Sequence, residues 1–103
     1  ERHMIWGYDV HDVQIENFSN HLATPNRLLA QMKFKDSTAL SISSSRPTPT
    51  DSPFLYLEGA QTRDVKLVNN NFINLNKITD MDATIDKSEI LQLYNLTNPA
   101  HEK

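Results

Sequence analysis

Apolar and polar residues alternate in four short segments that are spaced almost evenly along the chain. In each segment two apolar residues stand two positions apart, and a small polar residue follows; the segments are Val13/Ile15/Asn17, Leu40/Ile42/Ser44, Val65/Leu67/Asn69 and Leu91/Leu93/Asn95. The first apolar residues of successive segments are 27, 25 and 26 residues apart. Because alternation with a period of two is typical of a strand with one buried face, the pattern predicts four equivalent β-strands.

A second set of strand-like positions precedes the first by about eight residues. Its members are Ile5, Met32, Leu57 and, more weakly, Ala83. The two glycines of the chain, Gly7 and Gly59, each stand two residues after a member of this set, so we expect them at one repeat position where the backbone needs a positive φ or a close approach. Each repeat is therefore predicted to run as strand, bend, strand, polar turn and variable return.

A repeat of this length predicts the fold class. Units of about 20–50 residues that cannot cover their own apolar face stack into a solenoid, and the period of two excludes helical repeats. We predict an all-β parallel β-helix of about four coils, forming a single module over residues 1–97 with coils near 3–27, 28–52, 53–78 and 79–97 and a frayed tail at 98–103. The alternative is a small β-sandwich with a turn about every 8–12 residues.

A small polar residue ends the second strand of every repeat. The residues at this position are Asn17, Ser44, Asn69 and Asn95. Side-chain amides can hydrogen-bond to their equivalents in stacked strands, and asparagine tolerates the left-handed conformation of a tight turn. We therefore expect a structural ladder here, such that Asn69→Leu destabilises the stack and Asn71→Ser has little effect.

Charge and composition narrow the classes of partner. The 103 residues carry a net charge of −3 and no cysteine. Nucleic acid is not an expected partner because there is no basic field to displace counterions, and disulfides and thiolate metal sites are excluded. No apolar run reaches the about 20 residues of a membrane-spanning helix. The uncovered ends of such a stack are expected to pair with upstream coils of the same polypeptide or with another copy.

The segment Pro53–Phe72, PFLYLEGAQTRDVKLVNNNF, resembles the closing coils of exported right-handed β-helix proteins of the pectin-lyase-like group. It is most similar to the carboxyl-terminal coils of bacterial polygalacturonase-type glycoside hydrolases, over about residues 28–95. The resemblance implies a right-handed helix, a secreted, periplasmic or cell-surface location, and a parent enzyme that cleaves uronic-acid-rich polysaccharide.

The catalytic motifs of those hydrolases are missing from this sequence, which contains no Asn-Thr-Asp, Asp-Asp, Gly-His-Gly or Arg-Ile-Lys. No catalytic residue is therefore carried over, no cofactor is expected, and the chain is predicted to form non-catalytic coils. The alternative is a structural or carbohydrate-binding β-helix module of an adhesin or tailspike-type surface protein.

Aromatic and basic residues provide the candidate polysaccharide-binding site. Aromatic rings offer a large rigid surface that can stack on sugar rings. By alternation from Ile5, Trp6 faces outward, and we predict that Trp6, Tyr8, His11 and Arg63 bind the substrate. Packing of Trp6 under a return loop or a neighbouring domain is the alternative.

Two acidic patterns have a catalytic or metal interpretation beside a structural one. Asp12 and Asp64 stand at equivalent positions two coils apart, so we expect their carboxylates to be about 10 Å apart. This separation is near the upper limit, roughly 9.5 Å, for the two carboxyl groups of an inverting hydrolase. The alternative is that both aspartates are turn residues. The run Asp80–Glu89 offers Asp80, Asp82 and Asp86 to calcium. It has Ile85 and Leu91 where a calcium loop needs Gly and Glu, which favours a polar return loop.

Overall fold

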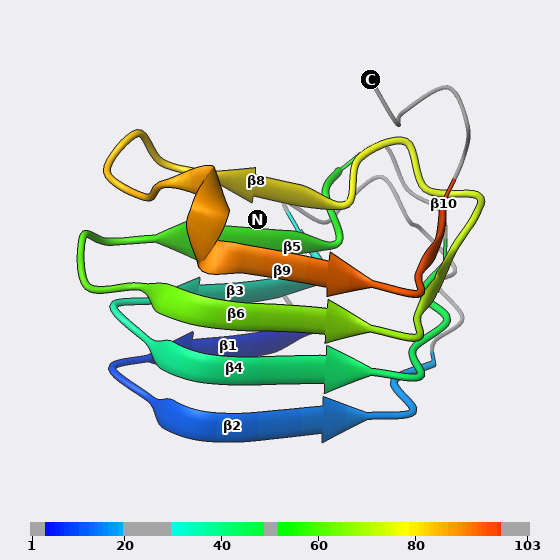
Figure 1. Cartoon of the computed structure of the whole chain (residues 1–103), viewed down its shortest axis with the longest axis horizontal. Coiled ribbons are helices and arrows are strands. Elements are labelled where there is room, and N and C mark those ends of the chain that lie inside the picture. Colours follow the sequence, from blue (N-terminus) through cyan, green and yellow to red (C-terminus); the bar gives the residue numbers. More distant parts are fainter. Residues whose placement is uncertain (1–3, 20–29, 49–51, 98–103) are drawn as a thin grey trace.

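The computed structural model describes residues 4–19, 30–48 and 52–97, which form a β-solenoid (Figure 1). The first sheet has the order β1 (Ile5–Tyr8), β3 (Met32–Lys35), β5 (Leu55–Glu58), β8 (Thr79–Met81). The second has the order β2 (His11–Glu16), β4 (Thr38–Ser43), β6 (Arg63–Val68), β9 (Ile90–Leu93). A third, small sheet pairs β7 (Asn71–Phe72) with β10 (Leu96–Thr97), and the 3₁₀ helix η2 (Lys87–Glu89) precedes β9.

The strand pairs within these ranges are all parallel. In every coil the chain passes from a strand of the first sheet to one of the second, and each coil stacks on the one before it (Figure 1). The predicted all-β solenoid is therefore confirmed, although it makes about three turns where about four coils were predicted. The β-sandwich is excluded because its sheets are antiparallel. The predicted tail and the segment 20–29 lie outside the described residues.

Each coil changes direction at residues with a positive φ. They occupy three positions of the repeat: Asp9 and Asp36; Asp12, Ala39 and Asp64; and Asn17, Ser44, Asn69 and Tyr94. Aspartate and asparagine are favoured in the left-handed region because their short polar side chains hydrogen-bond locally. The recurring Asp and Asn residues of the sequence are thus mainly bend residues.

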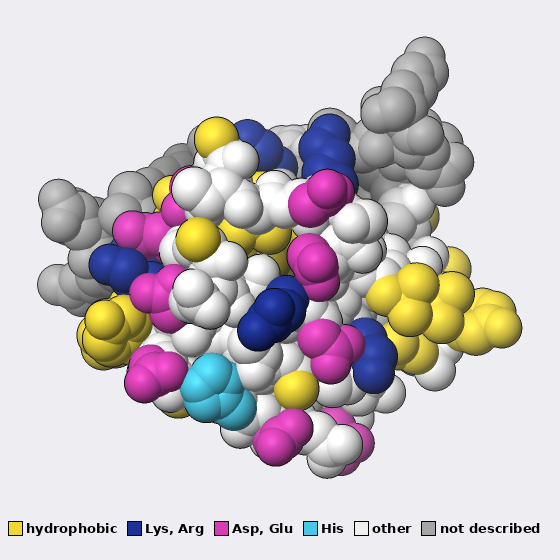
Figure 2. All heavy atoms as spheres, turned by 60° about the vertical axis from the view of Figure 1, so that its left-hand side comes forward, with side chains coloured by type: hydrophobic (Ala, Val, Ile, Leu, Met, Phe, Trp, Pro, Cys, Tyr) yellow, Lys and Arg dark blue, Asp and Glu magenta, His cyan; other side chains and the backbone are white. Residues whose placement is uncertain are grey.

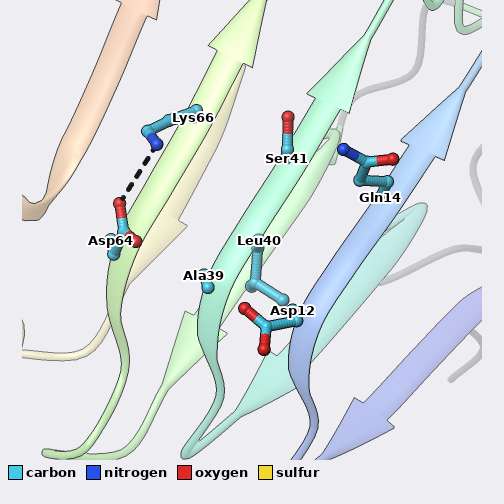
Figure 3. Close-up of a pocket in the computed structure, with 7 residues that line it drawn as sticks. All are labelled: Asp12, Gln14, Ala39, Leu40, Ser41, Asp64 and Lys66. Carbon is cyan, nitrogen blue, oxygen red and sulfur yellow. Dashed lines mark ion pairs between the residues drawn. The ribbon is translucent and has the colours of Figure 1, made fainter.

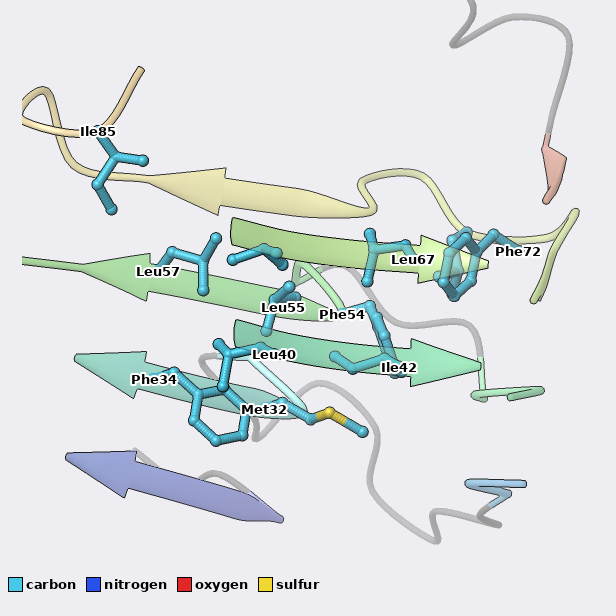
Figure 4. Packing of buried hydrophobic residues seen from close by; sticks show 12 residues of the cluster. Met32, Phe34, Leu40, Ile42, Phe54, Leu55, Leu57, Leu67, Phe72 and Ile85 are labelled. Atoms are coloured by element: carbon cyan, nitrogen blue, oxygen red, sulfur yellow. The ribbon is translucent and has the colours of Figure 1, made fainter. Parts of the chain in front are cut away.

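The core lies between the two sheets and consists of stacked apolar side chains (Figure 4). The fully buried members include Met32, Leu40, Ile42, Phe54, Leu55, Leu57, Val65, Leu67 and Phe72. Full burial of one such side chain contributes about 1.5–3 kcal/mol. A column of tilted aromatic rings adds to the stack, with ring centroids 6.0 Å apart for Phe18–Phe54 and 5.1 Å apart for Phe54–Phe72.

The predicted register of the second sheet is right for three coils and wrong for the last. Val13, Leu40 and Val65 are paired as expected, but the partner of Val65 is Ile90. Leu91 and Leu93 consequently point outward and are 47% and 40% exposed. β9 ends its sheet, so its inward face has a neighbouring strand on one side only and burial there gains less than in a central strand.

The register of the first sheet was also predicted wrongly. Met32 pairs with Leu55, Leu57 pairs with Met81, and Ala83 lies beyond β8. The cause is a longer bend: two residues separate β1 from β2 and β3 from β4, but four separate β5 from β6. The two extra residues increase the sequence separation between the first-sheet strand and the second-sheet strand of that coil.

The two glycines therefore hold different positions, contrary to the prediction. Gly7 lies in β1 opposite Phe34, where an added Cβ would come within 2.7 Å of the Phe34 ring. Gly59 follows β5 with φ +94°, a conformation that favours glycine. One glycine makes room for a core ring, and the other forms a bend.

The asparagine ladder includes Asn95, as predicted, but its other asparagine is Asn70, one residue after the predicted Asn69. Asn17, Ser44 and Asn69 are bend residues with positive φ, as is Tyr94. The buried Asn70 accepts a hydrogen bond from the backbone N–H of Ser45 (2.9 Å). Asn95 in turn accepts from the backbone N–H of Asn70 (2.8 Å) and from its side-chain amide (3.0 Å). The ladder residues are thus Asn70 and Asn95, and Asn69 is not one of them.

Candidate functional site

The outer side of the first sheet carries a group of aromatic and charged side chains, which we call the aromatic face. Its residues are Trp6, Tyr8, Lys33, Lys35, Tyr56 and Glu58. Trp6 pairs with Lys33, which pairs with Tyr56; Tyr8, Lys35 and Glu58 form the neighbouring row. Alternation puts Gly7, Phe34 and Leu57 into the core and leaves these six side chains outside.

The rings and lysines of the aromatic face contact one another. The Lys33 ammonium lies 5.9 Å from the Tyr56 ring centroid, and the Lys35 ammonium lies 5.6 Å from that of Tyr8. Both lysines also pair with Glu58, at 3.1 Å and 4.0 Å. Trp6 and Tyr8 nevertheless remain 63% and 56% exposed. The face therefore presents open aromatic rings beside two lysines that share Glu58 as their partner.

A second cluster, the bend corner, lies where the coils turn into the second sheet. It consists of Asp9, His11, Thr38 and Arg63, and the last three are paired across β2, β4 and β6. His11 Nε2 lies 2.9 Å from Asp9 Oδ1, and His11 Nδ1 lies 2.7 Å from Thr38 Oγ1. Figure 2 shows this side of the molecule, with acidic and basic side chains around the histidine.

A polar hollow of about 440 Å³ lies on the outer side of the second sheet. Its polar lining comes from Asp12, Gln14, Ser41, Asp64 and Lys66. Figure 3 shows Asp12 and Asp64 on the strands that flank the one carrying Ala39, so the predicted equivalence of the two aspartates is correct. Asp64 is paired with Lys66 at 3.7 Å. Ala39 leaves the space between the two carboxylates open, although its φ of 57° would suit Asp or Asn better.

The acidic run after β8 forms a return loop whose carboxylates bind backbone N–H groups. Asp82 accepts from the N–H groups of Gly59 and Thr84, both at 2.9 Å. Asp86 caps η2 by accepting from the Ser88 N–H at 2.9 Å. Among the described residues, no group of three His, Asp or Glu side chains could hold a metal ion. The geometry gives Asp82 and Asp86 a structural role.

The hydrogen bonds of this loop predict an acid-sensitive stability. The Gly59 N–H, and next the Thr84 hydroxyl, lower the pKa of Asp82; the Ser88 N–H lowers that of Asp86. A carboxyl whose pKa is lower in the folded state stabilises the fold above its unfolded pKa of about 4, and this contribution is lost as the pH falls through the folded pKa. At pH values below about 4, we expect the melting temperature to decrease as the pH is lowered. This decrease should be less steep in the Asp82→Asn variant. Equal slopes in both proteins would contradict this assignment.

The predicted binding residues fall on two surfaces. Trp6 and Tyr8 lie together on the aromatic face, whereas His11 and Arg63 lie at the bend corner with Thr38 between them. Sequence reasoning did not select Lys35, Tyr56 or Thr38 as site residues. The first-sheet repeat would have placed Tyr56 in one row with Trp6, with Lys33 between them, had the longer bend before β6 been recognised.

Comparison with protein-family models, with curated proteins and with solved structures found no match to the chain. In the described ranges, no helix is both long and apolar enough to cross a membrane. The functional conclusion therefore depends on the surfaces themselves and on the sequence resemblance.

Proposed function

We propose that the chain forms coils of a right-handed β-helix protein that bind polysaccharide without cleaving it. The observation that carries this proposal is the aromatic face, where Trp6 and Tyr8 stand on one strand with their rings largely in solvent. A soluble fold gains nothing from exposing two large rings side by side, but a sugar ring can stack on each of them. The parallel strands below hold both rings on a rigid surface.

Positive charge on the same face favours an acidic glycan. Lys35 lies beside Tyr8, and its side chain is 43% exposed, so it can approach a ligand carboxylate. Its contact with Glu58 is long, at 4.0 Å, and easily exchanged for a carboxylate in solvent. Uronic acid units combine an apolar ring face with a carboxylate, and both features have a counterpart here. This chemistry agrees with the uronic-acid-rich substrate that the resemblance implies for an exported, glycan-degrading parent protein.

A structural module of an adhesin or tailspike-type surface protein is the second candidate. It is favoured by the incompletely covered side of the first coil, where Ile5, Val13 and Ile15 are only partly buried. Edge strands such as β1 and β2 present backbone groups to which a further coil can pair. In that case Trp6 would contact protein in the assembled molecule.

Replacing Trp6 by Ala is expected to weaken binding to polygalacturonate about tenfold, equivalent to about 1.4 kcal/mol, because one stacking surface is removed. Isothermal titration calorimetry of the wild-type chain and of the variant with polygalacturonate measures this change in affinity. Tyr94→Asn is the matched control: Tyr94 is 81% exposed but lies off the aromatic face, and asparagine suits its φ of 58°. The control should bind like wild type. Absence of binding by folded wild-type chain would refute polysaccharide recognition and favour the structural module.

A further inference from the structure

The bend corner contains three side chains in a hydrogen-bonded relay. Asp9, His11 and Thr38 are connected by contacts of 2.9 Å and 2.7 Å through the two nitrogens of one imidazole. The carboxylate can only accept, so the ring nitrogen facing it, Nε2, carries the proton. Nδ1 is then an acceptor and receives the hydroxyl proton of Thr38. The arrangement is that of an acid, a base and a nucleophile within hydrogen-bonding reach.

The backbone holds these three groups at fixed positions. Asp9 is a bend residue with φ 56°, and its backbone N–H donates to the Lys35 carbonyl at 2.9 Å. His11 and Thr38 are register partners in β2 and β4. The Thr38 backbone N–H donates to the Val10 carbonyl at 3.1 Å. The relay is thus part of the stacked coils, where rigid strands fix the side chains.

An electrophilic group lies beside the nucleophile. Arg63 is the register partner of Thr38 on the next strand, β6, and its side chain is exposed. A guanidinium at this position can donate hydrogen bonds to an oxygen that becomes negative during attack at Thr38. The polar hollow is lined by Asp12 and Ala39, the residues that follow His11 and Thr38 in the sequence, so it adjoins the relay.

From this geometry we propose that Asp9, His11 and Thr38 catalyse acyl transfer from small, accessible esters, with Arg63 as the oxyanion donor. Short-chain acyl esters are the substrate class, since the corner is open and has no deep apolar pocket for a long chain. The proposal does not depend on glycan binding, because none of the four residues belongs to the aromatic face.

The reaction consumes one ester and one water and yields an acid and an alcohol. Thr38 Oγ1 attacks the ester carbonyl while its proton passes to His11 Nδ1, and the tetrahedral oxyanion faces Arg63. Collapse breaks the bond to the alcohol, which leaves with the proton from His11. Water then attacks the acyl-Thr38 ester, with His11 again taking and returning a proton, and the free acid leaves. Asp9 stabilises the imidazolium throughout.

The exposure of the relay to solvent limits the rate enhancement that we expect from it. The side chains of His11 and Asp9 are 50% and 72% exposed, so water competes with both hydrogen bonds. Asp36 and Asp64, also at the bends, add negative charge that weakens the oxyanion interaction with Arg63. We therefore expect general-base catalysis at the low end of its usual range, about 100-fold.

Hydrolysis of p-nitrophenyl acetate by the full chain tests the proposal. Thr38→Val keeps the shape and strand preference of Thr38 and removes its hydroxyl. This variant and His11→Gln should each lower the rate about 100-fold, and Asp9→Asn, which suits the same bend, about tenfold. His21→Gln is the control for unspecific imidazole catalysis and should leave the rate unchanged.

A second measurement does not depend on any variant folding. Acid quenching during turnover, followed by peptide mass mapping of wild-type chain, should locate the acetyl group on Thr38. Acetyl found only on histidine or lysine would overturn the proposal. Wild-type rates in a Thr38→Val variant with an unchanged strand spectrum would do the same. Loss of this activity with intact polygalacturonate binding would leave the proposed function standing.

Discussion

Asn70→Leu is expected to lower the free energy of unfolding by about 2–5 kcal/mol. The Asn70 side chain is buried, accepts from the Ser45 N–H (2.9 Å) and donates to the Ile42 carbonyl (3.0 Å). Leucine can make neither bond, and each buried backbone group left unsatisfied costs about 1–3 kcal/mol. The extra apolar contact of leucine offsets only part of this loss. Urea denaturation followed by circular dichroism measures the change.

The neighbouring asparagine provides the control that separates the observed ladder from the predicted one. Asn69 is exposed and has φ 58°, a conformation that glycine adopts readily, so Asn69→Gly should change stability by at most about 0.5 kcal/mol. If Asn69→Gly lowered the free energy of unfolding as much as Asn70→Leu, the ladder would lie at Asn69, as the repeat pattern of the sequence predicted.

Phe54→Ala is expected to destabilise the fold by about 3–5 kcal/mol, the usual loss for a buried phenylalanine. Phe54 is fully buried, and its ring lies between those of Phe18 and Phe72. Its removal breaks the aromatic column that joins successive coils and leaves a cavity in the hydrophobic core (Figure 4). The midpoint of chemical unfolding measures the loss.

Trp6→Ala is the matched control for this core substitution. It also deletes a large aromatic ring, but from the solvent-exposed side of the first sheet, so we expect a change within about 0.5 kcal/mol. Similar losses for the two variants would mean that Trp6 is covered in solution, as the structural-module candidate requires. A loss below about 1 kcal/mol for Phe54→Ala would contradict the core position of its ring.

The second-sheet strands were predictable because each combines a period-two pattern with a recurring spacing. Val13, Leu40 and Val65 recur at nearly constant spacing and are register partners, and the alternation fixes which face is buried. The first-sheet register was harder to predict, since the bend after β5 has four residues where the earlier bends have two. A change of bend length leaves no mark in the apolar pattern of either strand.

The candidate sites were predictable only in part, because a site depends on which strands are neighbours. Alternation from Ile5 is enough to place Trp6 and Tyr8 outside. It cannot show that lysines of the second coil reach the rings of Tyr8 and Tyr56 in the coils on either side, or that Thr38 hydrogen-bonds to His11 over a separation of 27 residues. Those contacts depend on the exact register between coils.

By itself, the sequence determined the all-β class and favoured a solenoid over a β-sandwich, because stacked coils account for the recurrence of the strand pattern at a nearly constant spacing. Tertiary structure decided the register of the last strand. There the apolar pattern favours burying Leu91 and Leu93, whereas Asn95 accepts a hydrogen bond from the Asn70 N–H and donates one to the Leu67 carbonyl, and these bonds require Ile90 to face inward. At the end of the stack, burial of Leu91 and Leu93 would add little stability. A ladder amide without its hydrogen bonds would cost as much stability there as in any central coil. The polar contacts therefore set the register.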